Sequence, residues 1–398
     1  MGKVYVRRGR VQPIVYRHPW LFSGSVERVE GDVAPGDAVD VLDPKGRFLG
    51  RGFYSDASQI RVRLFAFEPG VEPDHAFFRD RLARAAAFRR DALGLPAPGR
   101  TDAFRLVHSE ADGLPGLVVD RYGDVLVVQI SHVALERRKD VLLAALAEVF
   151  GPLAVLQRDD PHFRALEGLE PVDAYLSPEG GGADEVEVME LGVRYRVDLR
   201  AGQKTGLYFD QRTNRALAAT LAGGRRVLDL FSYTGAFALA VAREGGSAGV
   251  VAVESSPAAV ERGRANARAN GFAGIEFVRE DAYKYLGALR AGGGAFGMIV
   301  LDPPAYAPSS RYLDQGLRKY FDLNSLALSV LSPGGILVTC SCSGAVSEDD
   351  FEGALSTASV KAGRAVRVFH RGGQASDHPV SPHCPEGRYL KAFFCQVE

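Results

Sequence analysis

The sequence predicts an α/β protein in which a doubly wound parallel sheet follows a small β-barrel and an α+β middle domain. Three observations predict this class. Short strand patterns separated by turn residues fill residues 1–70, helices and strands in mixed order fill residues 71–184, and strands alternate with segments of helical length over residues 185–398. A chain of 398 residues is also long enough for two or three domains.

Composition and charge exclude several classes of protein. The chain is 46% hydrophobic and 24% charged, and it has no run of about 18 apolar residues that could span a membrane. The basic N-terminus lacks the apolar stretch and cleavage site of a secretory signal, so we expect a cytoplasmic protein with no membrane partner. Four cysteines are too few for a disulfide framework, and a formal net charge of −1 excludes polyanion binding through bulk charge but permits a local basic patch.

The first region, residues 1–70, has the pattern of a small β-barrel. Turn residues such as Asp43-Pro44-Lys45-Gly46 separate segments that each fit one strand. The last strand pattern alternates apolar Ile60, Val62 and Leu64 with arginines, as expected for a strand with one buried face. The expected strands are residues 37–42, 48–54 and 59–65.

The second region, residues 71–184, reads as a separate α+β middle domain. Apolar residues at helical spacing predict one helix over residues 74–92 and another over residues 135–150. Strands are expected at residues 104–109, 117–121, 125–130 and 154–157. The glycines at 180–182 indicate a linker or a hairpin loop.

The third region, residues 185–398, predicts the doubly wound parallel sheet. A pair of strands at residues 186–190 and 193–198 leads into it. The parallel strands are expected at residues 226–230, 249–254, 275–279, 298–302 and 336–340. A loop, and not a full crossover helix, joins the final segments at 365–371 and 388–396, which predicts an antiparallel edge.

Acidic residues stand at or just beyond the carboxyl ends of successive strands, where ligands of open α/β sheets bind. Asp229 closes the first strand and is followed by Gly235 without the G-x-G-x-x-G spacing of a dinucleotide site, which favours a ligand with a cationic amino group. Glu254 closes the second strand, where a carboxylate can accept hydrogen bonds from ribose hydroxyls. Asp281 follows the third strand, where it can accept from an adenine amine, and Asp302 closes the fourth.

With these four acids at the ends of successive strands, the chain over about residues 191–398 resembles the class I S-adenosylmethionine-dependent methyltransferases. The resemblance implies a Rossmann-like fold and S-adenosylmethionine as the cofactor. Further stretches are similar to bacterial 23S ribosomal RNA cytosine-5 methyltransferases of the RlmI-like family, and segment 17–24 (RHPWLFSG) resembles the opening of that family's PUA domain, a barrel that binds RNA. These stretches are 201–212 (AGQKTGLYFDQR), 340–344 (CSCSG), 377–380 (DHPV) and 385–391 (PEGRYLK). The resemblance implies 23S ribosomal RNA as partner and a homodimer.

The resemblance also assigns roles to residues. The implied cofactor-binding residues are Phe209, Gln211, Arg212, Asp229, Ser232, Tyr233, Gly235, Glu254, Asp281 and Asp302. Basic side chains precede the first acid of the chain, Glu27, and this opening predicts RNA contacts. The expected RNA-binding residues are Arg7, Arg8, Arg10 and Arg17.

Methylation at C5 of cytosine needs a positioned cysteine, because C5 becomes nucleophilic only after a thiolate adds to C6. Cys340 closes an apolar strand, whereas Cys342 lies beyond it between serines and before Gly344. We therefore interpret Cys342 as the nucleophile, in agreement with the Ser-Cys-Ser stretch of the family, and Cys340 as a buried apolar residue. Asp302 is the second catalytic candidate, accepting from the cytosine amine or a protonated N3.

One departure from related enzymes concerns breakdown of the adduct. Many RNA cytosine-5 methyltransferases carry a second cysteine directly after the proline of the fourth-strand motif, where it assists product release. This chain has Ala305 at that position, so the group that assists is open.

Two alternatives remain at this point. Asp302-Pro303-Pro304 also resembles the motif of enzymes that methylate an exocyclic adenine or guanine amine, although the aromatic residue stands one place late at Tyr306. The other alternative is a non-catalytic RNA-binding factor in ribosome assembly. Asp377, His378, His383 and Cys384 do not have a known zinc spacing, so no metal is expected.

Overall fold

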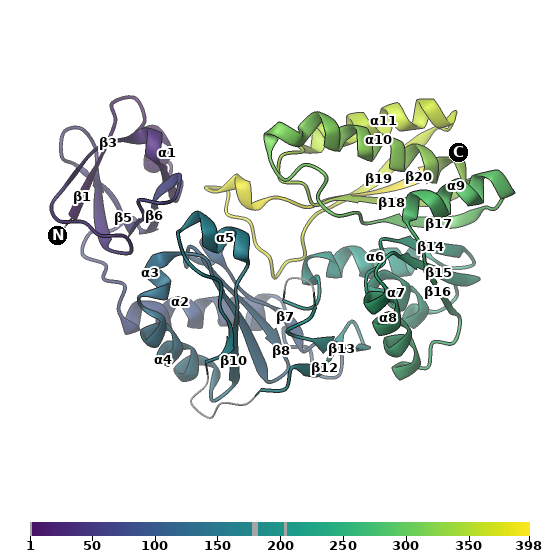
Figure 1. The fold of residues 1–398 in the computed structure, drawn as a ribbon, viewed down its shortest axis with the longest axis horizontal. Helices are drawn as coiled ribbons and strands as arrows, with labels where there is room; N and C mark the ends of the chain where they lie inside the picture. The colour runs from purple at the N-terminus through teal and green to yellow at the C-terminus, as the bar shows by residue number, and fades with distance from the viewer. Residues whose placement is uncertain (1, 177–181, 203–204) are drawn as a thin grey trace. The chain divides into compact units, whose positions relative to one another are not determined.

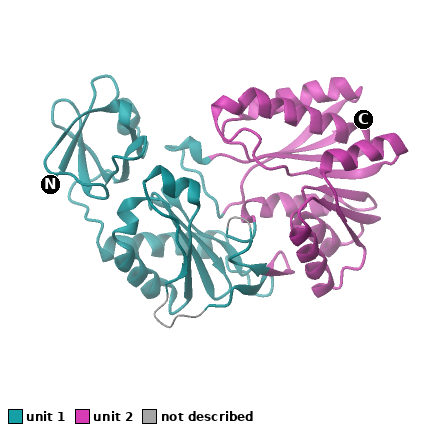
Figure 2. Cartoon of the chain, viewed as in Figure 1, with its two compact units in different colours: residues 1–188, 197–207, 377–387 teal, residues 189–196, 208–376, 388–398 magenta. Residues whose placement is uncertain are grey.

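A computed structural model describes residues 2–176, 182–202 and 205–398, which fold into two compact units (Figures 1 and 2). Unit 1 consists of residues 1–188, 197–207 and 377–387, and unit 2 of residues 189–196, 208–376 and 388–398. The domain bounds expected from the sequence, 1–70, 71–184 and 185–398, stay predictions. Most of the glycine-rich linker expected at 180–182 lies outside the described residues, as do Gln203 and Lys204.

Unit 1 begins with a six-stranded sheet in the order β2-β6-β5-β4-β1-β3. The strands expected at 37–42, 48–54 and 59–65 are present within one residue. Val62 and Leu64 are buried, as the alternation in β6 predicted. The elements are β1 (Gly2–Val6), α1 (Gln12–Val15), β2 (Trp20–Phe22), η1 (Ser23–Ser25), β3 (Val26–Glu30), β4 (Ala38–Leu42), β5 (Phe48–Tyr54) and β6 (Ile60–Ala66).

The second module of unit 1 is a five-stranded sheet in the order β11-β10-β9-β8-β7. Its first helix, α2 (His75–Ala87), begins at Asp74, whose carboxylate accepts the Phe77 amide at 2.9 Å. It continues into a π-helical turn, η2 (Phe88–Ala92). The remaining elements are β7 (Ala103–His108), η3 (Ser109–Asp112), β8 (Leu117–Tyr122), β9 (Val125–Ile130), α3 (Val133–Glu136), α4 (Lys139–Phe150), β10 (Ala154–Arg158), α5 (Pro161–Leu166) and β11 (Asp173–Tyr175).

The two modules of unit 1 share one of their hydrophobic clusters, while a separate cluster that includes Val4, Val39 and Val62 lies within the first module. Phe53 and Phe65 come from the first sheet and pack in the same buried cluster as Phe77 and Phe78 of α2. The ring centroids of Phe65 and Phe77 are 5.2 Å apart, and those of Phe53 and Phe65 are 4.5 Å apart. Burial of these rings therefore stabilises the two modules together.

The segment of residues 377–387 belongs to unit 1 although unit 2 residues flank it. Its anchor is Asp377, whose side chain accepts the Arg105 amide at 2.8 Å and whose carbonyl accepts from the Arg89 guanidinium at 2.7 Å. His378 is 2% exposed, and its ring lies tilted against that of His108, with ring centroids 5.2 Å apart. The Asp-His-Pro stretch thus has a structural role in unit 1, and η6 (Pro385–Gly387) ends the segment.

Unit 2 contains a seven-stranded sheet in the order β16-β15-β14-β17-β18-β20-β19. Five strands are parallel, and β20 pairs antiparallel with both β18 and β19, which confirms the expected antiparallel edge. The strands are β14 (Arg226–Leu230), β15 (Gly249–Glu254), β16 (Ile275–Arg279), β17 (Phe296–Leu301), β18 (Leu331–Ser341), β19 (Val366–Gly372) and β20 (Lys391–Val397); the hairpin β12 (Glu185–Glu190) and β13 (Val193–Asp198) precedes them.

Helices cover both faces of this sheet (Figure 1). Apolar side chains of α9, α10 and α11 pack on the main buried cluster of strand residues. The helical elements of unit 2 are η4 (Phe209–Gln211), α6 (Arg212–Leu221), α7 (Ala236–Glu244), α8 (Pro257–Ala269), α9 (Ala282–Gly292), η5 (Ser310–Tyr312), α10 (Leu313–Ser329) and α11 (Glu348–Ala362). Because β14 to β18 are parallel, their carboxyl ends meet at one edge, which is where a ligand site is expected.

Within the described residues, no helix combines the length and the apolar character needed to cross a membrane.

Candidate active site

The loop between β14 and α7 has a strained backbone. Phe231 and Tyr233 have left-handed φ angles of 60° and 50°, which residues with a side chain rarely adopt. Gly235 follows with φ of 81°, and a Cβ at this position would lie 2.8 Å from the Phe277 ring. Such strain is characteristic of ligand-binding loops, and it turns the loop tightly over the end of β14.

Asp229 is the buried acid at the end of β14. Its Oδ2 accepts the Ala238 amide at 3.0 Å, whereas Oδ1 has no hydrogen-bond partner among the described residues. Burial raises the pKa of this carboxyl to about 8. Ser232 Oγ and Thr234 Oγ1 are also buried there without a partner in the described chain. Because buried polar atoms are normally satisfied, these three groups fit the amino and carboxylate groups of an amino-acid-like ligand.

Glu254 and Asp281 stand at the ends of the next two strands. Glu254 accepts the amides of Tyr233 and Ser256 at 3.0 and 2.8 Å, which fixes the direction of its carboxylate. Asp281 caps α9, accepting the Tyr283 and Lys284 amides through Oδ1 at 3.0 Å. Both carboxylates keep lone pairs for further donors such as ribose hydroxyls or an adenine amine.

A chain of amides and acids lies at the end of β17. Gln211 Nε2 donates to Asp302 Oδ1 at 2.9 Å, and Asn214 Nδ2 donates to Gln211 Oε1 at 2.6 Å. The expected residue Phe209 is 2% exposed, and the Arg212 guanidinium lies 3.2 Å from Glu190 Oε1. The structure thus brings Gln211 to Asp302, while the Arg212 guanidinium lies 5.7 Å from the centre of the Phe209 ring. Cofactor contacts by these residues stay predictions.

Cys342 is a half-buried thiol held between two fixed serines. Ser341 Oγ and Ser343 Oγ each lie 2.9 Å from the Tyr320 hydroxyl. Cys342 Sγ lies 3.8 Å from the Pro303 carbonyl oxygen, next to Asp302 in the chain. Cys340, by contrast, is fully buried, and burial raises its thiol pKa well above the ordinary range. The assignment of Cys342 as the nucleophile stays a prediction.

Sequence reasoning missed Tyr320, Asn214 and Lys391. Lys391 Nζ donates to the Ser343 carbonyl at 2.7 Å and to the Tyr389 carbonyl at 3.0 Å, and the residue is 5% exposed. A lysine that opens the apolar strand KAFFCQV was a signal available in the sequence. Nothing in the spacing marked Tyr320, which lies on α10 among ordinary core residues.

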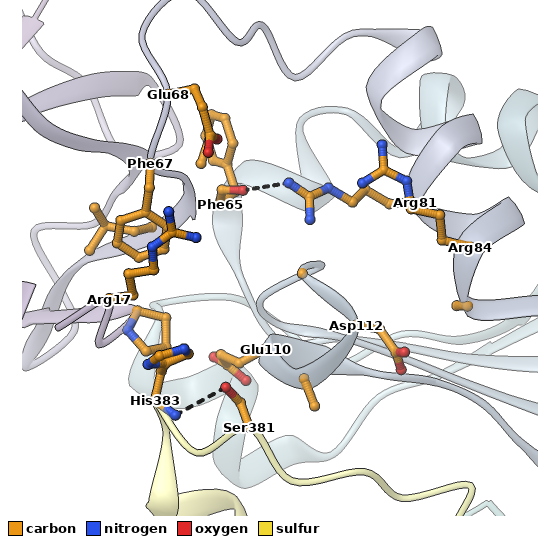
Figure 3. A pocket seen from close by; sticks show the side chains of 16 residues that line it. Arg17, Phe65, Phe67, Glu68, Arg81, Arg84, Glu110, Asp112, Ser381 and His383 are labelled. Carbon is orange, nitrogen blue, oxygen red and sulfur yellow. Dashed lines mark hydrogen bonds between the residues drawn. The ribbon is translucent and has the colours of Figure 1, made fainter. Parts of the chain in front are cut away.

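Unit 1 contains a basic pocket of about 470 Å³ (Figure 3). It is lined by Arg17, Arg81 and Arg84, none of which forms an ion pair among the described residues. Two of its acids are already engaged: Glu110 accepts from Trp20 and Arg63, and Asp112 pairs with Arg89. The third acid of the lining, Glu68, faces three arginines, so the lining carries an excess of positive charge.

The four predicted RNA-binding arginines lie in different surroundings. Arg17 lines the basic pocket with its guanidinium 5.5 Å from the centre of the Phe67 ring. Its backbone has a left-handed φ of 62°. Arg7, Arg8 and Arg10 are exposed in the turn between β1 and α1, and Arg7 Nε donates to the Val26 carbonyl at 2.8 Å.

One cluster in unit 1 has the composition of a metal site: His18, Cys384 and Glu386. His18 Nδ1 lies 3.1 Å from the Trp20 amide nitrogen and 3.3 Å from the Trp20 carbonyl oxygen; in the tautomer that accepts from the amide, Nε2 carries the ring proton. Nε2 then donates to Glu386 at 3.1 Å. The expectation that no metal is bound stays a prediction.

Comparisons with known proteins agree with the site. A family model described as S-adenosylmethionine-dependent methyltransferase matches residues 146–370, and one described as a PUA-like domain matches residues 4–67. The chain is 39% identical over 401 residues to ribosomal RNA large subunit methyltransferase I of Cronobacter sakazakii, covering 99% of each chain. It is also 39% identical over 402 residues to the protein of the same name from Serratia proteamaculans, again covering 99% of each.

Solved structures show the same fold over the full length. A protein of Streptococcus mutans described as a SAM-dependent methyltransferase has a TM-score of 0.84 at 22% identity, covering 100% of both chains. A methyltransferase structure complexed with SAH has a TM-score of 0.85 at 21% identity with the same coverage. The Rossmann-like fold, the methyltransferase activity and the use of S-adenosylmethionine expected from the sequence are thereby confirmed. The chain belongs to the family of S-adenosylmethionine-dependent methyltransferases that includes ribosomal RNA large subunit methyltransferase I.

Proposed function

We propose that this enzyme methylates C5 of a cytidine in ribosomal RNA, in the 23S molecule, through a covalent adduct between Cys342 and C6. The observation that carries the proposal is the position of Cys342. Its half-buried thiol stands at the carboxyl edge of the sheet, with Sγ 3.8 Å from the carbonyl oxygen of Pro303 and beside the acid Asp302. A nucleophile and a group that can bind a pyrimidine edge are therefore adjacent.

The proposed reaction assigns each bond change. The Cys342 thiol loses its proton, and the thiolate adds to C6, which makes C5 nucleophilic. S-adenosylmethionine supplies a methyl group on a sulfonium, and C5 takes it as that carbon–sulfur bond breaks. A base removes the C5 proton, and the electron pair expels the Cys342 thiolate from C6, restoring the aromatic ring.

Asp302 and the Pro303-Pro304 backbone are the proposed binding elements for the base. The Gln211 amide donates to Asp302 Oδ1, which directs the carboxylate and leaves acceptor capacity for the cytosine amine or a protonated N3. A protonated N3 withdraws electrons from C6 and favours thiolate addition. Asp302 would therefore act on both binding and the first bond-forming step.

The proposed cofactor contacts follow from the unsatisfied groups of the β14–α7 loop. Asp229 Oδ1, Ser232 Oγ and Thr234 Oγ1 are buried without partners in the described chain, and they suit the amino-acid end of the cofactor. Glu254 suits the ribose hydroxyls and Asp281 the adenine amine. These acids also argue against a non-catalytic assembly factor, which has no need of them.

Ribosomal RNA is proposed as the substrate because the relatives with 39% identity are named for it. The PUA-like match over residues 4–67 and the basic pocket of unit 1 support an RNA contact there. Arginines without carboxylate partners bind phosphate groups well, because the guanidinium fork matches phosphate oxygens. We propose that Arg17, Arg81 and Arg84 contact the RNA backbone, in addition to the exposed Arg7, Arg8 and Arg10.

The amino-methyltransferase alternative is less well supported. It requires an aromatic ring directly after Asp302-Pro303-Pro304 to stack on the target base. The residue directly after the motif is Ala305, and the Tyr306 ring packs against Tyr320 with centroids 5.0 Å apart. Tyr306 therefore packs against Tyr320, whose hydroxyl group contacts Ser341 and Ser343.

The test is substitution of the proposed nucleophile. Cys342→Ala should abolish methyl transfer to ribosomal RNA while S-adenosylhomocysteine still binds, because the thiol contacts the base and not the cofactor. Wild-type enzyme should also form a denaturation-resistant adduct with RNA carrying 5-fluorocytidine, since fluorine does not leave as a proton does. Cys340→Ala is the matched control, with full activity and a stability loss of about 1 kcal/mol. Full activity of Cys342→Ala, or a methyl group on an exocyclic nitrogen, would contradict the proposal.

A further inference from the structure

A buried lysine lies next to the proposed nucleophile and has no role in the reaction as described so far. Lys391 is the first residue of β20, and in the antiparallel register its Cα is the partner of Ser341 at the end of β18. Its side chain is 5% exposed. Nζ donates to the carbonyl of Ser343, which follows Cys342 directly, at 2.7 Å, and to the carbonyl of Tyr389 at 3.0 Å. The lysine thus joins the Ser341–Ser343 turn to β20.

This ammonium group has no carboxylate partner among the described residues. Both of its identified contacts are carbonyl oxygens, so its positive charge is not neutralised by an ion pair. Burial lowers the pKa of Lys391 to about 8, while negative charge at Cys342 and Glu348 opposes the decrease. Glu348 is exposed and also pairs with Arg371 at 3.0 Å, so it offers only a screened counter-charge.

Among the described residues, the other titratable groups identified near Cys342 are acidic or neutral. Together with burial, negative charge on Asp302 and on Cys342 raises the pKa of both Tyr208 and Cys340. These groups therefore interact electrostatically with one another. The groups that face the turn from the surrounding elements are Asp302 after β17, Tyr208 and Asp210 before α6, Tyr320 on α10, Cys340 on β18, Glu348 on α11 and Lys391 on β20. A thiolate formed beside Asp302 needs a nearby cation.

We propose that Lys391 is a positioning residue for Cys342: it fixes the Ser341–Ser343 turn through its two carbonyl hydrogen bonds, and its ammonium stabilises the Cys342 thiolate. The inference rests on the proposed function for its catalytic meaning. The effect of Lys391 on the ionisation of Cys342 can be tested separately from methyl transfer, because the pKa of a thiol can be measured without RNA. A nearby positive charge favours the thiolate and so lowers the pKa of a thiol, and partial burial strengthens the effect.

The test is the pH dependence of Cys342 alkylation in the full-length protein. Iodoacetamide reacts with the thiolate, which forms the carbon–sulfur bond as iodide leaves, and mass spectrometry of the Cys342 peptide reports the rate. Wild-type Cys342 should show half-maximal reactivity below the ordinary thiol pKa of about 8.5. In Lys391→Met the midpoint should rise by about one unit, so that the rate at pH 7 falls about ten-fold. Lys391→Arg keeps the charge and should retain most of the lowered midpoint.

Lys361→Met is the matched control, because Lys361 is exposed in the last turn of α11. It should leave the alkylation profile unchanged. Binding of S-adenosylhomocysteine reports whether each Lys391 variant is folded. If Lys391→Met does not fold, the alkylation midpoints of the wild type and of Lys391→Arg test the inference. A wild-type midpoint at or above 8.5, or an unchanged midpoint in folded Lys391→Met, would overturn the inference. A shifted midpoint together with an active Cys342→Ala would overturn the proposed function and leave the role of Lys391 in thiol ionisation intact.

Discussion

At the scale of single residues, the protonation state of Asp229 is coupled to ligand binding. One carboxylate oxygen is held by the Ala238 amide, and the other is buried without a partner in the described chain. Burial favours the neutral acid and raises its pKa to about 8. A cationic amino group placed against Oδ1 would reverse this preference, because it stabilises the carboxylate. Binding and ionisation are therefore coupled at this residue.

The coupling gives a pH dependence with a definite sign. An aspartate in an unfolded chain has a pKa of about 3.9, so between that pH and about 8 the folded, cofactor-free protein binds a proton that the unfolded chain has released. The free energy of unfolding should therefore decrease as the pH rises from about 4 to about 8. In Asp229→Asn this contribution disappears, and S-adenosylhomocysteine binding should weaken. Chemical denaturation at pH 5.5 and 7.5 measures the first effect, and calorimetry the second; equal pH dependence in both proteins would contradict it.

Single residues of the site could be predicted where local sequence carries the information. Cys342 stands after an apolar strand among small polar residues, and Asp229, Glu254, Asp281 and Asp302 follow strands that are recognisable by their composition. Lys391 is unusual as a lysine at the start of an apolar strand, but its place beside Cys342 could not be predicted, because it depends on the pairing of β18 with β20. Tyr320 could not be predicted, because its contacts depend on the packing of α10. Those contacts join segments that are distant in the chain.

At the scale of elements, the end of α2 shows what hydrophobic spacing misses. The pattern predicts one regular helix over residues 74–92, but the last five residues form the π-helical turn η2. The turn leaves Phe88 39% exposed and buries Arg89, which pairs with Asp112 at 2.6 Å and binds the Asp377 carbonyl. A buried arginine finds its partners only in the folded chain, so the sequence gives no local signal for this change of helix type.

The same helix supports a prediction about RNA binding. Arg81 and Arg84 line the basic pocket, and burial together with the charge of Arg84 lowers the pKa of Arg81, which indicates a site that favours an anion. Arg81→Gln should weaken binding of a ribosomal RNA fragment and reduce the slope of log affinity against log salt concentration by about 0.7–0.9. Filter binding between low and moderate salt measures both quantities.

The matched control for this prediction is Arg79→Gln. Arg79 lies on the same helix but does not line the pocket, and its guanidinium already pairs with Asp80 at 2.8 Å. The substitution removes the same formal charge as Arg81→Gln. Because Arg79 lies outside the pocket, its loss should leave the RNA affinity and the salt slope close to those of the wild type. Identical slopes in the two variants would show that RNA does not reach the pocket.

At the scale of the whole molecule, the extent of unit 1 is set by its shared core. Local patterning predicted the strands of the first sheet and treated the middle module as a separate domain. The first sheet has a buried cluster of its own, which includes Val4, Val39 and Val62, but Phe53 and Phe65 belong to a second cluster together with Phe77 and Phe78 of the middle module. Removing residues 1–70 would therefore expose apolar surface of the middle module, and point substitutions are the cleaner probe. The homodimer implied by the family resemblance stays a prediction that sedimentation equilibrium can measure.

The shared core predicts cooperative unfolding of the two modules. Phe65 is 3% exposed and contacts rings on both sides, so Phe65→Ala should cost about 3–5 kcal/mol of stability. Hydrogen exchange should accelerate to a similar degree in β4 to β6 and in α2 and β7, because one opening event exposes both. Val360→Ala, on the exposed face of α11, should change neither region. Faster exchange confined to the first sheet would mean that the modules open independently.

The path of the chain has a consequence for how such proteins can diverge. The chain passes between the two units after residues 188, 196, 207, 376 and 387. No single cut releases either unit intact, because residues 377–387, which complete the first unit, are encoded after most of the second. A genetic crossover at one point would combine fragments of both units from two parents, and would bring together buried partners such as Arg89 and Asp377 from different lineages. The two units are therefore expected to be inherited together.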